Sequence, residues 1–87
     1  MGSYEIRWKG LAERDLRNID PQQISRIVQA IESLIANPFP SQYRKLRGSE
    51  RDYRIRVGDY RVVYQVDVEA RVVTIYHVRH RREAYRK

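Results

Sequence analysis

Three arginines, Arg54, Arg56 and Arg61, flank a short turn in the second half of the chain. From Tyr53 to Val66, every second residue belongs to an apolar set, and the arginines fall in the other set. If Gly58-Asp59 forms a two-residue hairpin with the glycine first, Arg56 lies directly opposite Arg61. Like charges about 5 Å apart repel by roughly 1 kcal/mol in water and about 3 kcal/mol at an effective dielectric of 20. A phosphate between them would reverse the sign, so the pattern predicts a phosphate site.

A plainer interpretation stays open at this point. Arginines on a solvated sheet face commonly do no more than keep the sheet soluble, and Glu50, Asp52 or Asp59 could neutralise them. If the next reversal is the four-residue turn at 67–70, Tyr76 falls beside Arg61. A tyrosine there could stack on a base, although a packed strand tyrosine is the commoner case.

The basic tail adds further candidates. Arg79 and Arg82 could hold phosphate, and a neutral imidazole at His80 could act as a base beside it. His77 stands at a strand end, where histidine is more often structural than catalytic. No His, Asp or Glu cluster has ligand spacing, and no Gly-rich phosphate loop is present, so we expect neither a metal nor another cofactor.

The bulk composition agrees with an anionic partner. The 87 residues carry a formal charge of +7, and only Lys9, Lys45 and Lys87 among the 18 basic residues are lysines, the others being arginine. Arginine binds phosphate bidentately and stacks on bases, which favours nucleic acid. The chain has no cysteine, no apolar run of membrane-spanning length and no hydrophobic signal segment. We therefore expect one cytoplasmic domain, 1–87, without a membrane partner.

The elements that must position these residues are visible in the periodicity. Asp20-Pro21 combines an N-cap with a proline at the first helical position, and the prolines at 38 and 40 end the helix that follows. The sequence predicts an α+β fold in which a helical hairpin packs on one face of a small antiparallel sheet, in the order β-α-α-β-β-β. The position of the first strand in the sheet is left open. The predicted elements are a strand at 4–8, helices at about 9–18 and 21–36, a polar connector at 41–52 and strands at 53–57, 60–66 and 71–78.

Two motifs carry a resemblance to a known family. They are YRIRVGDYRVVY at 53–64 and HVRHRREAY at 77–85, and the helical hairpin and Leu46-Arg47-Gly48 also fit. The chain resembles the RelE/ParE toxin superfamily of bacterial and archaeal toxin–antitoxin systems over nearly its whole length. RelE-like members cleave mRNA in the ribosomal A site without a metal, whereas ParE-type gyrase poisons share the scaffold. The resemblance implies attack of a ribose 2′-OH on the adjacent phosphate, which leaves a cyclic phosphate.

The resemblance also implies residue roles. Arg61 matches the arginine that stabilises the phosphate, and Arg81 matches the arginine after the last strand, with Arg79 as the alternative. Tyr85 matches the tail tyrosine that stacks on the base and assists proton transfer.

Arg54 and Arg56 stand where the best-known RelE enzyme has lysines. Arginine does not give up its proton near neutral pH, so these two residues can hold phosphate but are poor bases. The base is then Tyr85, His80 or Lys45, in that order.

The implied function is a type II toxin, a ribosome-dependent mRNA endonuclease that inhibits translation. Its implied partners are mRNA, the ribosome and a cognate RelB-like antitoxin, which would bring acidic residues to the basic face. The alternatives from other classes are a ParE-like gyrase poison without nuclease activity and an RNA-binding domain that keeps only the scaffold.

Overall fold

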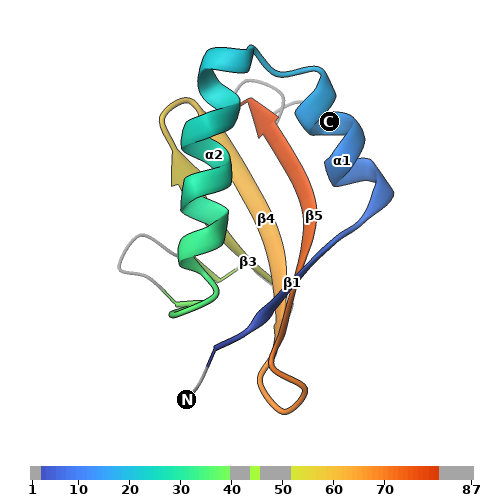
Figure 1. Ribbon diagram of the computed structural model, residues 1–87, viewed down its shortest axis with the longest axis vertical. Coiled ribbons are helices and arrows are strands. Elements are labelled where there is room, and N and C mark those ends of the chain that lie inside the picture. Colours follow the sequence, from blue (N-terminus) through green and yellow to red (C-terminus); the bar gives the residue numbers. More distant parts are fainter. Residues whose placement is uncertain (1–2, 40–43, 46–51, 81–87) are drawn as a thin grey trace.

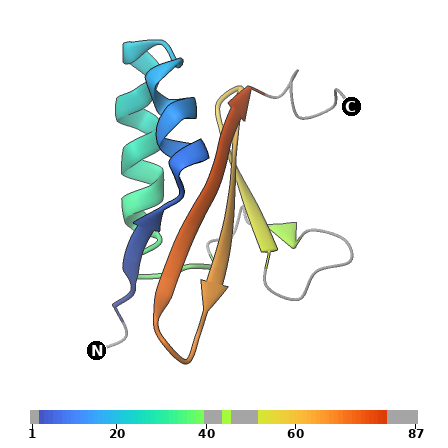
Figure 2. The same ribbon diagram turned by 90° about the vertical axis from the view of Figure 1, so that its right-hand side faces the viewer.

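The computed structural model describes residues 3–39, 44–45 and 52–80 of the chain. Both helices lie on one face of a curved sheet, and they leave the opposite face uncovered (Figures 1 and 2). No helix in these ranges is long and apolar enough to cross a membrane. The elements are β1 (Glu5–Trp8), α1 (Gly10–Arg17), α2 (Pro21–Ser33), β2 (Arg44–Lys45), β3 (Asp52–Val57), β4 (Tyr60–Asp67) and β5 (Val72–His80).

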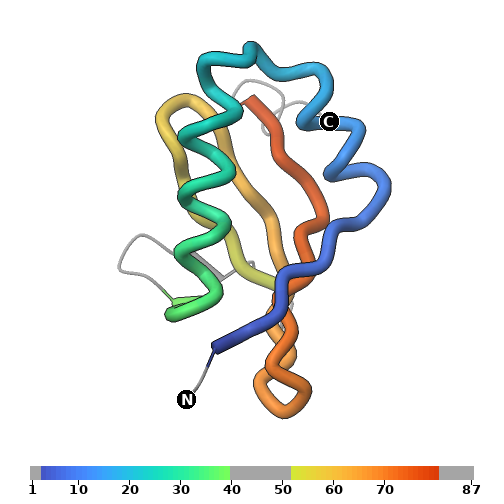
Figure 3. The backbone as a smooth tube through the Cα atoms, in the orientation of Figure 1, coloured from blue at the N-terminus to red at the C-terminus, as the bar shows by residue number. Residues whose placement is uncertain are grey.

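The helical hairpin forms as the sequence predicts. The Asp20 side chain accepts a hydrogen bond from the backbone N–H of Gln22 at 3.0 Å, and Pro21 occupies the first turn of α2. This cap satisfies one of the free N–H groups at the helix start. After α2 ends, the side chain of Asn37 accepts from the N–H of Phe39, and Pro38 prevents a further turn. The backbone trace shows α1 and α2 running in opposite directions (Figure 3).

The sheet has the strand order β1-β5-β4-β3-β2. β1 pairs with β5 in parallel, so the sheet is mixed. The sequence predicted an antiparallel sheet, and that part of the prediction was wrong. A parallel pair needs a long crossover, and the intervening helices and strands supply it. The predicted connector at 41–52 also contains β2, a two-residue strand that pairs with β3.

The β3–β4 hairpin has the predicted register, with Val57 opposite Tyr60 and Arg56 opposite Arg61. Gly58 has a φ of 59°, a left-handed conformation that glycine adopts at little cost.

The register of β4 with β5 differs from the prediction. Arg61 lies opposite Arg79, and Tyr76 does not lie beside it. The turn falls one residue later than expected, because Asp67 still pairs with Val72 and the reversal occupies 68–71. The Asp67 carboxylate accepts from the N–H of Ala70 at 3.0 Å, and Arg71 takes the positive φ at the end of the turn. A β-bulge at Tyr76 then shifts the register by one further residue.

The core lies between the helices and the sheet. Tyr64 is fully buried there, and its hydroxyl donates to the carbonyl of Pro38 at 2.8 Å. This bond ties the segment after α2 to the central strand. The buried hydrophobic residues are Ala12, Ile19, Ile27, Ile31, Leu34, Ile55, Val62, Tyr64, Val66, Val73, Ile75 and Val78.

The Tyr64 hydrogen bond gives a stability prediction. Tyr64→Phe should lower the free energy of unfolding by about 1–3 kcal/mol, because the buried Pro38 carbonyl loses its donor. Urea unfolding followed by circular dichroism measures the change. Tyr76→Phe is the matched control, since its hydroxyl lies 3.2 Å from Gln65 Oε1 in a half-buried position, and it should cost less. Equal losses in both variants would contradict this account of the core.

Candidate nucleic-acid interface

The face of the sheet that the helices leave uncovered is called the outer face here. Along β3 and β4 its residues alternate with the buried Ile55, Val62 and Tyr64, which face the helices. On β5, the contact of Tyr76 with Gln65 places the bulged Tyr76 on the outer face as well. The described residues of the outer face are Glu5, Arg7, Asp52, Arg54, Arg56, Arg61, Val63, Gln65, Asp67, Val72, Thr74, Tyr76, His77 and Arg79.

Three arginines form a line across the outer face. Arg56, Arg61 and Arg79 are direct cross-strand partners on β3, β4 and β5, and they are called the arginine row below. Directly opposed residues in a sheet have Cβ atoms about 4.5–5.5 Å apart. Arg54 lies two residues from Arg56 on the same strand and face. The structure thus brings together the predicted phosphate-binding residues Arg54, Arg56, Arg61 and Arg79.

The arginine row is accessible to a ligand. Arg56 and Arg79 are exposed, and Arg61 is half-buried. Arg56 Nε donates to the carbonyl of Gly58 at 3.2 Å, which holds its guanidinium near the hairpin turn. Among residues 3–39, 44–45 and 52–80, Arg7 pairs with Glu5, and Asp15 lies 3.8 Å from His77, a contact that is an ion pair only when the imidazole is protonated. Neither contact involves Arg56 or Arg79. The exposed guanidinium groups of Arg56 and Arg79 can offer N–H donors to a phosphate.

Two other predicted site residues lie elsewhere. His80 pairs with Tyr60 and so points to the helix side of the sheet, where the two rings meet edge to face at 5.3 Å. The structure therefore does not bring His80 together with Arg61. Tyr76 is on the outer face but lies near Gln65, with Lys9 Nζ 5.5 Å from the centre of its ring.

The remaining predicted residues can be placed only in part. The backbone of Lys45 pairs with that of Tyr53 at the edge of the sheet. Arg81, Arg82 and Tyr85 lie outside the described residues. No group of three or more His, Asp or Glu side chains in the described part of the chain could hold a metal ion.

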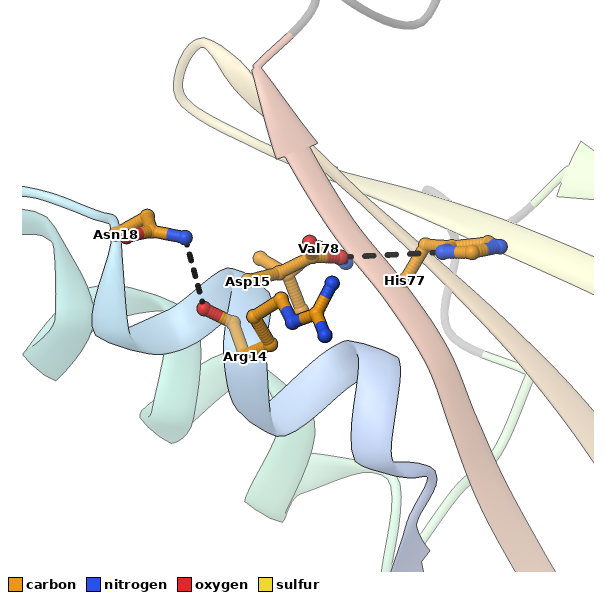
Figure 4. Close-up of polar contacts among 5 residues, drawn as sticks. All are labelled: Arg14, Asp15, Asn18, His77 and Val78. Atoms are coloured by element: carbon orange, nitrogen blue, oxygen red, sulfur yellow. Dashed lines mark hydrogen bonds and ion pairs between the residues drawn. The ribbon is translucent and has the colours of Figure 1, made fainter.

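One pair of polar residues escaped prediction. Asp15 of α1 reaches the edge of β5, where its Oδ2 accepts from the N–H of Val78 at 3.0 Å and lies 3.8 Å from His77 Nδ1 (Figure 4). No local motif could show this contact, because 63 positions separate Asp15 from Val78. The sequence could have shown only that His77, two residues from Arg79 on the same strand, belongs to the same face of the sheet.

The chain matches known proteins along most of its length. Residues 6–85 match the family described as the ParE toxin of the type II toxin–antitoxin system parDE. The chain belongs to the RelE/ParE toxin superfamily.

Among the relatives of this chain is RelE1 of Methanocaldococcus jannaschii. The two sequences are 33% identical, and the aligned region covers 84% of each. Toxin RelG of Mycobacterium tuberculosis is 31% identical, with coverage of 97% of this chain and 98% of that protein. The toxin in the archaeal RelE–RelB complex of Pyrococcus horikoshii superposes with a TM-score of 0.81 at 26% identity, over 91% of this chain and 96% of that one. The chain thus shares with these relatives both the helical hairpin and the sheet that carries the arginine row.

The arginine row should cost stability when no anion is bound. We expect Arg79→Gln to raise the free energy of unfolding by up to about 1 kcal/mol at low ionic strength, because one repulsive neighbour is removed. The gain should shrink as salt is raised from about 0.01 M to about 1 M, since the Debye length falls from about 30 Å to about 3 Å. Arg17→Gln, at the end of α1, is the control and should show no gain. A gain for Arg79→Gln that does not depend on salt would contradict charge repulsion as its cause.

Proposed function

We propose that this RelE/ParE superfamily member is an mRNA endonuclease toxin that acts on the translating ribosome. The observation that carries the proposal is the arginine row on the uncovered face of the sheet, in a chain whose relatives above 30% identity bear RelE-type names. The substrate is a phosphodiester of mRNA in the ribosomal A site. The reaction is attack of the ribose 2′-oxygen on the adjacent phosphorus, with loss of the 5′-oxygen.

The arginine row suits this reaction because charge accumulates on the phosphate oxygens as the attacking oxygen arrives. Preorganised cations aimed at such charge lower the barrier more than they stabilise the substrate. In this proposal Arg61, at the centre of the row, binds the scissile phosphate together with Arg79 or Arg81. Arg54, Arg56 and Arg82 hold neighbouring phosphates.

Proton transfer falls to other groups, because guanidinium stays protonated. Tyr85 stacks on a base and protonates the leaving oxygen, while Lys45 stays a candidate for a supporting role. His80 is not assigned a role, because it faces the helix side of the sheet.

We infer that a RelB-like antitoxin silences the protein. The related toxin of Pyrococcus horikoshii was solved in complex with RelB, which supports a partner of the same kind here. An acidic antitoxin segment over the outer face would neutralise the arginine row and, by the same contact, prevent it from binding the phosphates of RNA.

A second candidate function is a ParE-like gyrase poison, because the matching family is described by its ParE toxins. Such a protein inhibits by binding another protein and needs no cleavage chemistry. It would damage DNA and leave mRNA intact.

The test is to map 5′ ends of cellular mRNA after induction of the toxin. We expect new ends within ribosome-bound codons, and we expect Arg61→Ala to reduce cleavage by about 10²–10³-fold, as removal of one transition-state donor does elsewhere. Arg17→Ala removes the same charge from α1 and should leave cleavage unchanged.

Intact mRNA together with DNA damage and filamentation would favour the gyrase poison instead. Cleavage that is equally strong in Arg61→Ala would contradict the role of the arginine row.

A further inference from the structure

His77 is held in an unusual way on the outer face. Its Nδ1 is buried and has no hydrogen-bond partner, while the side chain keeps 31% of its surface exposed. The nearest acidic group is the Asp15 carboxylate, with Oδ2 at 3.8 Å, too long for a hydrogen bond but within ion-pair range. A buried polar nitrogen without a partner costs about 1–3 kcal/mol, so a small rotation of the ring toward Asp15 is favoured.

Asp15 itself is fixed in place. β1 pairs only with Val72–Ile75 of β5, and α1 places Asp15 beside the part of β5 that follows. There the carboxylate accepts the backbone N–H of Val78 at 3.0 Å, and its side chain is only 20% exposed. The acceptor for His77 is therefore provided by the helix layer and is anchored to the strand that bears the histidine.

A hydrogen bond from Nδ1 to Asp15 would orient the imidazole. A neutral histidine that donates its Nδ1 proton to a carboxylate has its free electron pair on Nε2. In Figure 4 the other ring nitrogen lies on the side of the imidazole away from Asp15. A carboxylate that selects the tautomer and direction of an imidazole in this manner is a common device in general-base catalysis.

His77 also lies next to the arginine row. It is two residues from Arg79 on β5 and diagonally across from Arg61, because its own partner on β4 is Val63. Diagonal neighbours in a sheet are about 7–8 Å apart at the backbone, a gap that long side chains bridge. A phosphate held by Arg61 and Arg79 would thus leave its ribose within reach of the imidazole.

We propose that His77, oriented by Asp15, is the general base that activates the ribose 2′-OH. This inference rests on the proposed function. Nε2 takes the proton of the 2′-OH as the 2′-oxygen bonds to phosphorus, and the bond from phosphorus to the 5′-oxygen breaks. The leaving 5′-oxygen takes a proton from the tail tyrosine or from water, so the products are a 2′,3′-cyclic phosphate and a 5′-OH end. Asp15 is a positioning residue and does not touch the substrate.

The charges around His77 suit such a base. Asp15 from α1 faces Nδ1, and it stabilises the imidazolium that forms when Nε2 takes the proton. Arg61 and Arg79 are its neighbours on the outer face, where they would bind the developing phosphorane. Arg14 of α1 lies beside Asp15 (Figure 4), and Lys9 lies over the ring of Tyr76.

The kinetic test uses the full chain, purified 70S ribosomes and mRNA under single-turnover conditions. We expect His77→Gln to lower the cleavage rate by about 10²–10⁴-fold and to change the pH profile of the reaction. Binding of mRNA with one 2′-deoxy residue at the cut site should be unchanged. Asp15→Asn should lower the rate with the same unchanged binding, whereas Glu13→Gln, which removes one negative charge from α1, should not.

A second measurement does not depend on activity. Nitrogen-15 NMR of the free protein should show neutral His77 protonated on Nδ1, and Asp15→Asn should weaken that preference. Neutral His77 protonated on Nε2 would overturn the proposal, as would a His77→Gln enzyme with the rate and pH profile of the parent. A loss of rate matched by an equal loss of affinity would also overturn it, because His77 would then only bind. If the parent protein cuts no mRNA although its NMR tautomer is as expected, the proposed function fails, and the base assignment fails with it.

Discussion

The structure places like charges opposite one another in one line across the sheet, at Arg56, Arg61 and Arg79. Two like unit charges about 5 Å apart repel by about 1 kcal/mol in water. The same strands carry Ile55, Val62 and Val78 on the helix side, all of them buried. Burial of one such side chain contributes about 1.5–3 kcal/mol, so the core more than offsets the row. A small domain can therefore maintain on one face a row of like charges that suits an anionic ligand.

The two layers have different tasks, but they are not independent. The helical hairpin covers the apolar face and leaves the outer face uncovered (Figure 2). At one point the helix layer acts on the outer face directly, because Asp15 of α1 reaches past the edge of β5 to His77. The contact is possible because α1 lies beside the part of β5 that follows its pairing with β1. It also supplies a carboxylate to a surface on which the sequence predicted cations.

The sequence predicts whatever depends on local periodicity. Alternation from Tyr53 to Val66 and the glycine turn were enough to place Arg56 opposite Arg61, and the cap at Asp20 was enough to start α2. The register of β4 with β5 was not predicted, because it depends on the exact position of the turn and on the bulge at Tyr76. Together these place Arg79, and not Tyr76, opposite Arg61. His80 was expected in the basic tail beside the phosphate site, but it is the last residue of β5 and faces the helices with Tyr60. The parallel pairing of β1 and the contact of Asp15 with His77 depend on tertiary packing, which no local pattern encodes.

The central claim is that the arginine row binds the phosphates of RNA. The most direct measurement is a proton–nitrogen NMR spectrum of the arginine Nε–H groups during titration with an RNA oligonucleotide that is 2′-O-methylated at every position and so cannot be cleaved. The account predicts that the signals of Arg56, Arg61 and Arg79 shift together and saturate, while that of Arg17 on α1 stays in place. A shift of the Arg17 signal alone, or equal shifts of all four signals, would contradict it.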